Sequence, residues 1–359
     1  MNKPSSIDEI LDFIREDGSP VLARGAGTKI PLCHAGEDTR CLDLSGLSGV
    51  MEYEPSEYVF SARAGTPLSE INGILEEYGQ YLPFDPPLSE AGATLGGTVA
   101  AGLSGPGRVR YGGLRDFILG VRFANGEGSV VKGGGKVVKN AAGFDFPKFL
   151  GGSLGRFAIL LETTFKVFPK PEASVTLVLS SDNLVEGLEK MMKASLSKWE
   201  PDALELEADG KLFIRLAGDR AGLPLRADEI FKVLGQGIVL EESAADDYWR
   251  NISEFSWTNQ GSSFAKVPIS PRMIPRLDGA MKPLPVERRY GMGGSVAWVG
   301  WQDESVAAKV SDALSALDLA GLVVRGAAQN PFIGQHPSYS IHSKVKNAFD
   351  PSGRFPQLL

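Results

Sequence analysis

The distribution of glycine constrains this chain more than any other feature of its sequence. Of its 43 Gly, 18 lie between residues 91 and 170, whereas residues 171–359 hold only 16. Glycine is unfavourable inside helices and strands but suits turns and places where a ligand approaches the backbone closely. The same stretch is cationic, because it carries 11 basic and 4 acidic side chains, against 6 and 16 in residues 1–90. This pattern predicts either a loop-rich domain with a basic face or a site for a phosphate-bearing ligand.

Composition excludes several other classes of protein. With 43% hydrophobic residues the chain is not disordered, no run approaches the roughly 20 apolar residues of a membrane span, and two Cys cannot form a disulfide framework. The net charge of −7 and the pI near 5.3 give no basic footprint for nucleic acid. The first residues lack the pattern of a secretion signal, so we expect a cytoplasmic protein.

The pattern of apolar and turn residues predicts an α+β protein. Residues 7–16 have apolar side chains at helical spacing, and Thr66-Pro67 is typical of a helix start, with Thr66 as the N-cap. Strands on either side of Asn125-Gly126-Glu127 indicate a hairpin.

The Pro-bounded segment 168–171 predicts the first domain boundary. Residues 174–240 then follow a β-α-β-β-α-β order, which is ferredoxin-like, and a strand-helix alternation continues over 263–324. We therefore expect a first domain over 1–171, an α+β domain for substrate binding or subunit docking over 172–345, and a C-terminal tail over 346–359.

The glycines do not fit the two common phosphate-binding motifs. None of the six Gly-x-Gly triplets has Gly three residues after its second glycine, so the Rossmann fingerprint is absent. Gly135-Lys136 is followed by Val137, whereas a P-loop requires Ser or Thr there.

Two other glycine segments remain. Residues 24–28 (RGAGT) place unobstructed backbone N–H groups on a turn, and residues 94–101 place glycines at the start of a short helical run. Each alone is a weak signal against a plain turn, but together they suggest a diphosphate held from two sides.

These segments belong to an ordered set of motifs that resembles a known family. The set comprises residues 24–28 (RGAGT), 82–87 (LPFDPP), 92–97 (GATLGG), 110–120 (RYGGLRDFILG), 139–145 (KNAAGFD) and 152–155 (GSLG). It resembles the FAD-binding domain of the vanillyl-alcohol oxidase, or PCMH, type, which has two subdomains and is followed by a cap domain. Within that family it is most similar to the FAD-binding E-type subunits of glycolate oxidase complexes.

The resemblance implies a role for each motif in binding FAD. The pyrophosphate would be held by Arg24, Gly25, Ala26, Gly27, Thr28, Thr94, Gly96 and Gly97. The isoalloxazine would lie near Pro83, Asp85 and Pro86, the ribose or pyrophosphate near Arg115 and Asp116, and the adenine along Gly152, Gly155 and Ile159. Many members of the wider family attach flavin to a His at the position of Thr28, so Thr28 implies noncovalent FAD.

Oxidation of a 2-hydroxy acid also requires a base for the hydroxyl proton and a cation for the carboxylate. The chain has three His, and His34, His336 and His342 are more simply read as loop or tail residues. The catalytic relatives carry His-rich patterns, Glu-His-Gly and Asp-Gly-Asn-x-x-His, that have no counterpart here. Four further candidates for carboxylate binding are more often solvated or interfacial: Arg272, Arg276, Arg288 and Arg289. Cys33 and Cys41 do not form a metal motif, and we expect no metal.

Three functional hypotheses remain. The first is an FAD-binding subunit of a complex that oxidises glycolate or a related 2-hydroxy acid, with a catalytic flavoprotein partner, an iron-sulfur partner, and contact with the inner membrane only through partners. The second is a self-sufficient FAD-dependent dehydrogenase, similar to D-lactate dehydrogenase, with an unrecognised base. The third is a scaffold subunit that binds no flavin.

Overall fold

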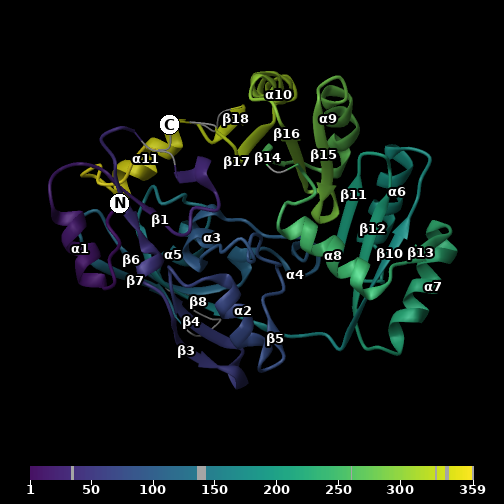
Figure 1. Ribbon diagram of the computed structural model, residues 1–359, viewed down its shortest axis with the longest axis horizontal. Coiled ribbons are helices and arrows are strands. Elements are labelled where there is room, and N and C mark those ends of the chain that lie inside the picture. The colour runs from purple at the N-terminus through teal and green to yellow at the C-terminus, as the bar shows by residue number, and fades with distance from the viewer. Residues whose placement is uncertain (34–35, 136–142, 260, 328–329, 336–338, 358–359) are drawn as a thin grey trace. The chain divides into compact units, whose positions relative to one another are not determined.

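The chain folds into two units, each made of more than one segment of the sequence. The computed structural model describes residues 1–33, 36–135, 143–259, 261–327, 330–335 and 339–357 (Figure 1). The first unit comprises residues 1–104, 113–170 and 338–359, and the second comprises 105–112 and 171–337. The sequence predicted the second unit to begin after residue 171. The structure adds the segment 105–112 to it.

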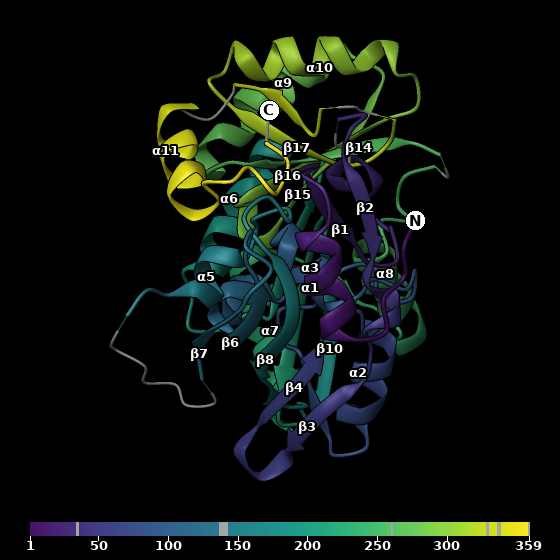
Figure 2. The same ribbon diagram turned by 90° about the vertical axis from the view of Figure 1, so that its left-hand side faces the viewer.

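The first unit is built on a five-stranded sheet with the strand order β3-β4-β8-β6-β7, which can be followed in Figure 2. Its strands and α-helices are α1 (Ile7–Arg15), β1 (Val21–Arg24), β2 (Arg40–Asp43), β3 (Val50–Glu54), β4 (Val59–Arg63), α2 (Leu68–Glu76), β5 (Gln80–Tyr81), α3 (Leu95–Ala101), β6 (Ile118–Ala124), β7 (Val130–Gly134), α5 (Phe146–Leu150), β8 (Ile159–Lys166), β9 (Phe168–Pro169) and α11 (Tyr339–Phe349). The predicted hairpin is confirmed, because β6 and β7 pair antiparallel across residues 125–129. A separate parallel pair, β1 and β2, holds the first glycine loop at its end.

The helix predicted after Thr66 forms, but Thr66 does not cap it. The helix α2 begins at Leu68 with Pro67 as its N-cap. The Thr66 hydroxyl instead donates to the carbonyl of Arg63 at 2.7 Å and accepts from the N–H of Gly49 at 2.9 Å. A buried hydroxyl therefore fixes the turn after β4 rather than the helix end.

The C-terminal segment returns to the first unit through a buried ion pair. The ammonium of Lys346 on α11 lies 2.6 Å from the carboxylate of Asp350 and donates to the carbonyls of Arg156 and Phe355. Lys346 and Asp350 are 1% and 2% exposed. In addition, the N–H of Val21 at the start of β1 donates to the carbonyl of Arg354. The tail thus supports the strand that leads into the glycine loop.

The second unit contains a nine-stranded sheet among its described residues. Its strands and α-helices are α4 (Arg108–Tyr111), β10 (Ala173–Leu179), α6 (Leu184–Ser195), β11 (Ala203–Glu207), β12 (Leu212–Gly218), α7 (Gly222–Leu234), β13 (Gly237–Val239), α8 (Glu242–Ser253), β14 (Ser263–Pro268), α9 (Ile274–Met281), β15 (Val286–Gly291), β16 (Val296–Trp301), α10 (Ser305–Ser315), β17 (Ala320–Arg325) and β18 (Phe332–Gly334).

The sheet of the second unit consists of two ferredoxin-like repeats. The predicted β-α-β-β-α-β order over β10–β13 is confirmed, with the strand order β13-β10-β12-β11. The elements β14-α9-β15-β16-α10-β17 repeat this order of strands and helices, with the strand order β15-β16-β14-β17 in the sheet. The second strands of the two repeats, β11 and β15, pair antiparallel. One face of the sheet packs against α6, α7, α9 and α10, and α8 packs on the opposite face against β10 (Figure 1).

No helix among the residues that the structure describes is long and apolar enough to cross a membrane.

The buried ion pair of the tail generates a stability prediction. Substituting Lys346→Met leaves the Asp350 carboxylate buried without its counter-charge, which costs about 3–5 kcal/mol. We expect a lower urea midpoint, measured by circular dichroism. Lys344→Met, an exposed change on the same helix, is the matched control and should alter stability by less than about 0.5 kcal/mol. Equal midpoints for the two variants would contradict the role given to Lys346.

Candidate functional site

The glycine loop after β1 lines a pocket in the first unit. Two adjoining hollows share the backbone of Gly25, Gly97 and Gly155. Of the residues predicted to bind FAD, those that line one or both hollows are Arg24, Gly25, Ala26, Gly27, Thr28, Thr94, Gly96, Gly97 and Gly155. The fold therefore brings the first and second glycine segments and the start of β8 together around one cavity.

The loop 25–28 supplies free backbone donors to this cavity. In the described part of the chain, the N–H groups of Ala26, Gly27 and Thr28 make no hydrogen bond. Gly27 has φ +73°, which only glycine adopts at low cost, and a Cβ there would lie 2.0 Å from the guanidinium of Arg24. A side chain at Gly25 would lie 2.1 Å from the Thr94 hydroxyl oxygen. The two glycines thus permit a tight turn, and consecutive N–H groups without a partner in the described part of the chain are typical of an anion-binding nest.

The second glycine segment shapes the cavity in a different way. The N–H groups of Leu95 and Gly96 donate to the carbonyls of Thr66 and Ala64, at 2.9 and 2.7 Å, and that of Gly97 donates to the Thr94 hydroxyl at 3.3 Å. These donors are used within the protein. A Cβ at Gly96 would lie 2.8 Å from the Ala64 carbonyl oxygen, so glycine is required there for α3 to approach β4.

Three cations surround the pocket, and two of them were not predicted from the sequence. Arg24 and Lys29 line it, and the buried Arg156 donates to the carbonyl of Leu32 on its wall. The charges of all three favour the thiolate of Cys33, although burial has the larger effect and raises the pKa of that thiol. Burial also disfavours the charged form of Arg156 and so lowers the pKa of its guanidinium. A positive wall beside free N–H groups matches the charge of a diphosphate.

Arg115 and Asp116 lie around a different hollow of the first unit. That hollow is also lined by Lys132, Lys148 and Lys166. The carboxylate of Asp116 accepts the N–H of Gly113 at 2.8 Å and so closes its own turn. The structure does not bring these two residues together with the glycine loop.

The remaining predicted residues occupy supporting positions. Pro83, Asp85 and Pro86 form a turn in which the N–H of Asp85 donates to the carbonyl of Leu82. Gly152 packs against Gly102, where a Cβ would lie 2.8 Å from the Gly152 Cα, and Ile159 is a buried residue of β8. None of these lines the two hollows, whereas their neighbours Ser153, Leu154, Ala158 and Leu160 do.

The other titratable candidates have structural partners. His342 lies on α11 with its ring 5.5 Å from that of Phe157, and burial together with Lys346 lowers its pKa. His34 and His336 fall outside the described residues, as does most of the predicted motif at 139–145. Cys33 and Cys41 are free thiols, and no metal-binding group of His, Cys, Asp or Glu occurs among the described residues.

The arginines considered for carboxylate binding are largely engaged. Arg288 pairs with Asp278 at 2.5 Å, and Arg289 is buried between Glu205 and Glu207. Arg276 contacts the sulfur of Met273, and Arg272 lies on the turn before α9.

The pocket and fold define a class of protein, and comparison with known proteins agrees. Residues 2–134 match the family model described as an FAD binding domain, so the chain is an FAD-binding flavoprotein. It is 31% identical over 350 residues to the glycolate oxidase subunit GlcE of Escherichia coli, covering 94% of this chain and 92% of that protein. The chain therefore belongs to the family of glycolate oxidase subunit GlcE.

Other relatives are matched over a smaller share of their length. The chain is 26% identical to the glycolate oxidase subunit GlcD of Bacillus subtilis and 28% identical to a mitochondrial D-lactate dehydrogenase (cytochrome) of Arabidopsis thaliana. The matches cover 64% and 56% of this chain, but only 49% and 35% of those proteins.

Solved structures confirm the fold. A structure of alkyldihydroxyacetonephosphate synthase superimposes with a TM-score of 0.72 at 14% identity, over 98% of this chain and 74% of that one. At this identity the likeness shows the fold alone.

The tight turn at Gly25 generates a prediction on flavin content. A Gly25→Val side chain would collide with Thr94 and displace the free donors, so we expect FAD binding to weaken by at least about tenfold, or about 1.4 kcal/mol. Flavin absorbance of the purified protein measures this. Gly18→Val, where a side chain meets open space, is the control. Full flavin content in Gly25→Val would overturn the placement of the pyrophosphate.

Proposed function

We propose that this chain is the FAD-binding subunit of a complex that oxidises glycolate or a related 2-hydroxy acid. The observation that carries the proposal is the set of free N–H groups at Ala26, Gly27 and Thr28 beside Arg24 and Lys29. These groups hold the FAD pyrophosphate, and the glycines keep its approach clear. When bound, FAD accepts the two electrons removed from the substrate.

The choice of substrate follows from the relatives. GlcE and GlcD are named as subunits of glycolate oxidase, and other relatives are D-lactate dehydrogenases. A 2-hydroxy acid is common to these names. We therefore infer that this chain contributes to the FAD-dependent oxidation of such an acid.

The scarcity of histidine supports a role within a complex. Abstraction of the hydroxyl proton requires a base within hydrogen-bond reach of the substrate. His342, the one histidine in the described part of the chain, has its pKa lowered and packs against Phe157. We infer that a partner flavoprotein of the GlcD type supplies the base, and that electrons leave the complex through an iron-sulfur subunit.

Purification and substrate reduction together test this function. Isolated from its native cells, the protein should co-elute with a second flavoprotein and an iron-sulfur protein. The FAD-loaded chain alone should not bleach under anaerobic glycolate, whereas the complex should, because only the complex contains the base. Bleaching of the isolated chain would favour a self-sufficient dehydrogenase, and a failure of the chain to bind FAD would favour a scaffold subunit.

Thr28 generates a separate prediction about how flavin is held. A threonine hydroxyl does not form the histidyl bond of covalent family members, so FAD should be bound without a covalent link. Precipitation of the holoprotein with trichloroacetic acid should release all the flavin into the supernatant, with no fluorescent band on a denaturing gel. Flavin that remains with the precipitate would refute this.

A further inference from the structure

A hollow in the first unit, apart from the flavin pocket, gathers cations of the glycine-rich stretch. Residues 91–170 carry 11 basic and 4 acidic side chains, yet among the described residues only Arg156 of these cations lies at the flavin pocket. Four others, from the turn before β6, from β7, from α5 and from β8, line the hollow: Arg115, Lys132, Lys148 and Lys166. FAD therefore does not account for this part of the positive charge.

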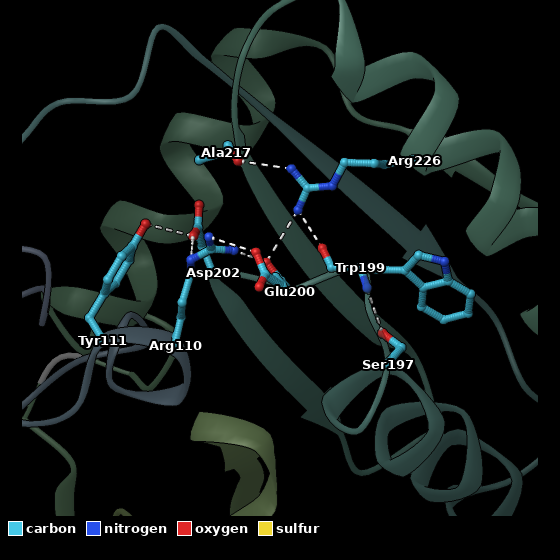
Figure 3. Close-up of polar contacts among 8 residues, drawn as sticks. All are labelled: Arg110, Tyr111, Ser197, Trp199, Glu200, Asp202, Ala217 and Arg226. Carbon is cyan, nitrogen blue, oxygen red and sulfur yellow. Dashed lines mark hydrogen bonds and ion pairs between the residues drawn. The ribbon is translucent and has the colours of Figure 1, made fainter.

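Other cations of the same stretch are paired with carboxylates elsewhere. Arg110 lies 3.0 Å from Glu200 and 3.5 Å from Asp202, within the polar network of the second unit that Figure 3 shows. Arg122 lies 2.6 Å from Glu162 across neighbouring strands of the first unit. These cations have structural partners, so they require no ligand.

The two carboxylates that line the hollow are already engaged. Asp116 accepts the N–H of Gly113 at 2.8 Å. Asp145 accepts the N–H of Lys148 at 3.1 Å, and its carboxylate lies 3.5 Å from the ammonium of the same lysine. One of the four cations is thereby neutralised.

The other three cations have no counter-ion. Within the part of the chain that the structure describes, the side chains of Arg115, Lys132 and Lys166 make no hydrogen bond or ion pair. The ammonium of Lys166 lies 5.0 and 5.9 Å from the ring centroids of Phe117 and Phe168, which hold it by cation–π contacts. Arg115 and Lys132 are exposed. The hollow therefore presents three positive groups whose charge no described residue balances.

Glycines and an aromatic ring shape the wall of this hollow at the end of β7. Gly134 has φ +73°, and a Cβ there would lie 2.1 Å from the carbonyl oxygen of Leu119. A Cβ at Gly133 would lie 2.6 Å from that of Phe146, so glycine is needed for β7 to approach α5 this closely. Phe144 also lines the hollow, and it is 60% exposed. Unpaired cations thus lie beside an exposed apolar ring.

This combination favours an acidic protein segment over a single small anion. An ion pair at an exposed position contributes little because water screens it, so one phosphate or carboxylate would be held weakly here. Several carboxylates on one segment add their contributions, and an apolar side chain of that segment can cover Phe144. A lipid surface fits less well, since it is too flat to enter a hollow and would bring anionic headgroups against Asp116 and Asp145.

We propose that this hollow is the docking site for an acidic segment of a partner protein. Carboxylates of the segment pair with Arg115, Lys132 and Lys166, and an apolar side chain packs on Phe144. The source of the segment rests on the proposed function, which requires a catalytic flavoprotein partner. Complementary charge of this kind speeds association and selects the partner. The glycine loop does not line this hollow, so docking leaves the FAD site open.

Binding of an acidic peptide to the FAD-loaded full chain tests the hollow. The probe is a fluorescein-labelled Glu-Asp-Glu-Phe-Glu-Asp-Glu peptide, and fluorescence anisotropy measures its dissociation constant. We expect this constant to rise at least about tenfold in the double variant Lys132→Glu/Lys166→Glu, and also when salt is raised from about 0.05 to about 0.5 M. Lys132→Arg keeps the charge and should retain binding. Lys309→Glu, an exposed change on α10 of the second unit, is the matched control and should bind as the unchanged chain does.

The aromatic contact provides a readout that charge alone would not change. Phe144→Ser should weaken binding of this peptide but not of a peptide with Ala in place of its Phe, because only the Phe side chain packs on the ring. Urea midpoints measured by circular dichroism show whether each variant is folded. If the double variant is not folded, Lys132→Glu alone, at an exposed position, replaces it and should still raise the dissociation constant.

Several results would overturn the proposal. One is a peptide that binds the charge-reversed chain as tightly as the unchanged chain, or does not bind the unchanged chain. Others are displacement of the peptide by an equal concentration of inorganic phosphate, which would indicate a small-anion site, and binding to phosphatidylglycerol vesicles in place of the peptide, which would indicate a lipid surface.

Assembly with the partner separates this proposal from the proposed function. A complex that forms equally well with the chain Lys132→Glu/Lys166→Glu would overturn the docking site and leave the proposed function intact. A chain that forms no complex would refute the proposed function, and the peptide titration, which uses no partner, would still decide whether the hollow binds an acidic segment.

Discussion

The flavin pocket depends on backbone donors that the fold leaves without partners. Ala26, Gly27 and Thr28 are exposed or half-buried, so their N–H groups are open to a ligand, and the surrounding structure holds the loop in this conformation. Here the parallel pair β1–β2 leads into the loop, α3 closes against β4 through Gly96, and the C-terminal tail bonds to the start of β1. Arg24, Lys29 and Arg156 add a positive potential, which bound diphosphate would neutralise.

The second unit reaches a large sheet by using one topology twice. The two ferredoxin-like repeats join through the antiparallel pairing of their second strands, β11 and β15. Neither strand is therefore an exposed edge of the sheet. The repeats differ in what lies on the face away from their helices. The first carries α8, which packs on β10, whereas Lys266 on β14 lies on that face of the second.

Particular residues show how far sequence reasoning reached. The loop 24–28, which the sequence predicted to hold a diphosphate, lines a pocket, and the sequence could indicate it because consecutive donors and glycines are a local property. Lys29 and Arg156 were missed, since their approach to the pocket depends on long-range packing and leaves no spacing signal. Arg115 and Asp116 belong to a motif that the family resemblance assigned to the cofactor, yet they line another hollow. The N–H groups of residues 95–97 were expected to donate to the ligand. The sequence did not show that acceptors within the protein take up these hydrogen bonds.

The sequence by itself determined the class of fold, the glycine loop and the shortage of histidine, because residue type and near-neighbour spacing decide which turns, repeats and bases a chain can form. Tertiary structure alone decided which backbone donors stay free, which cations reach the pocket, and that residues 105–112 pack with the second unit. These outcomes depend on contacts between residues that are far apart in the sequence but close in space, such as Arg110 and Asp202.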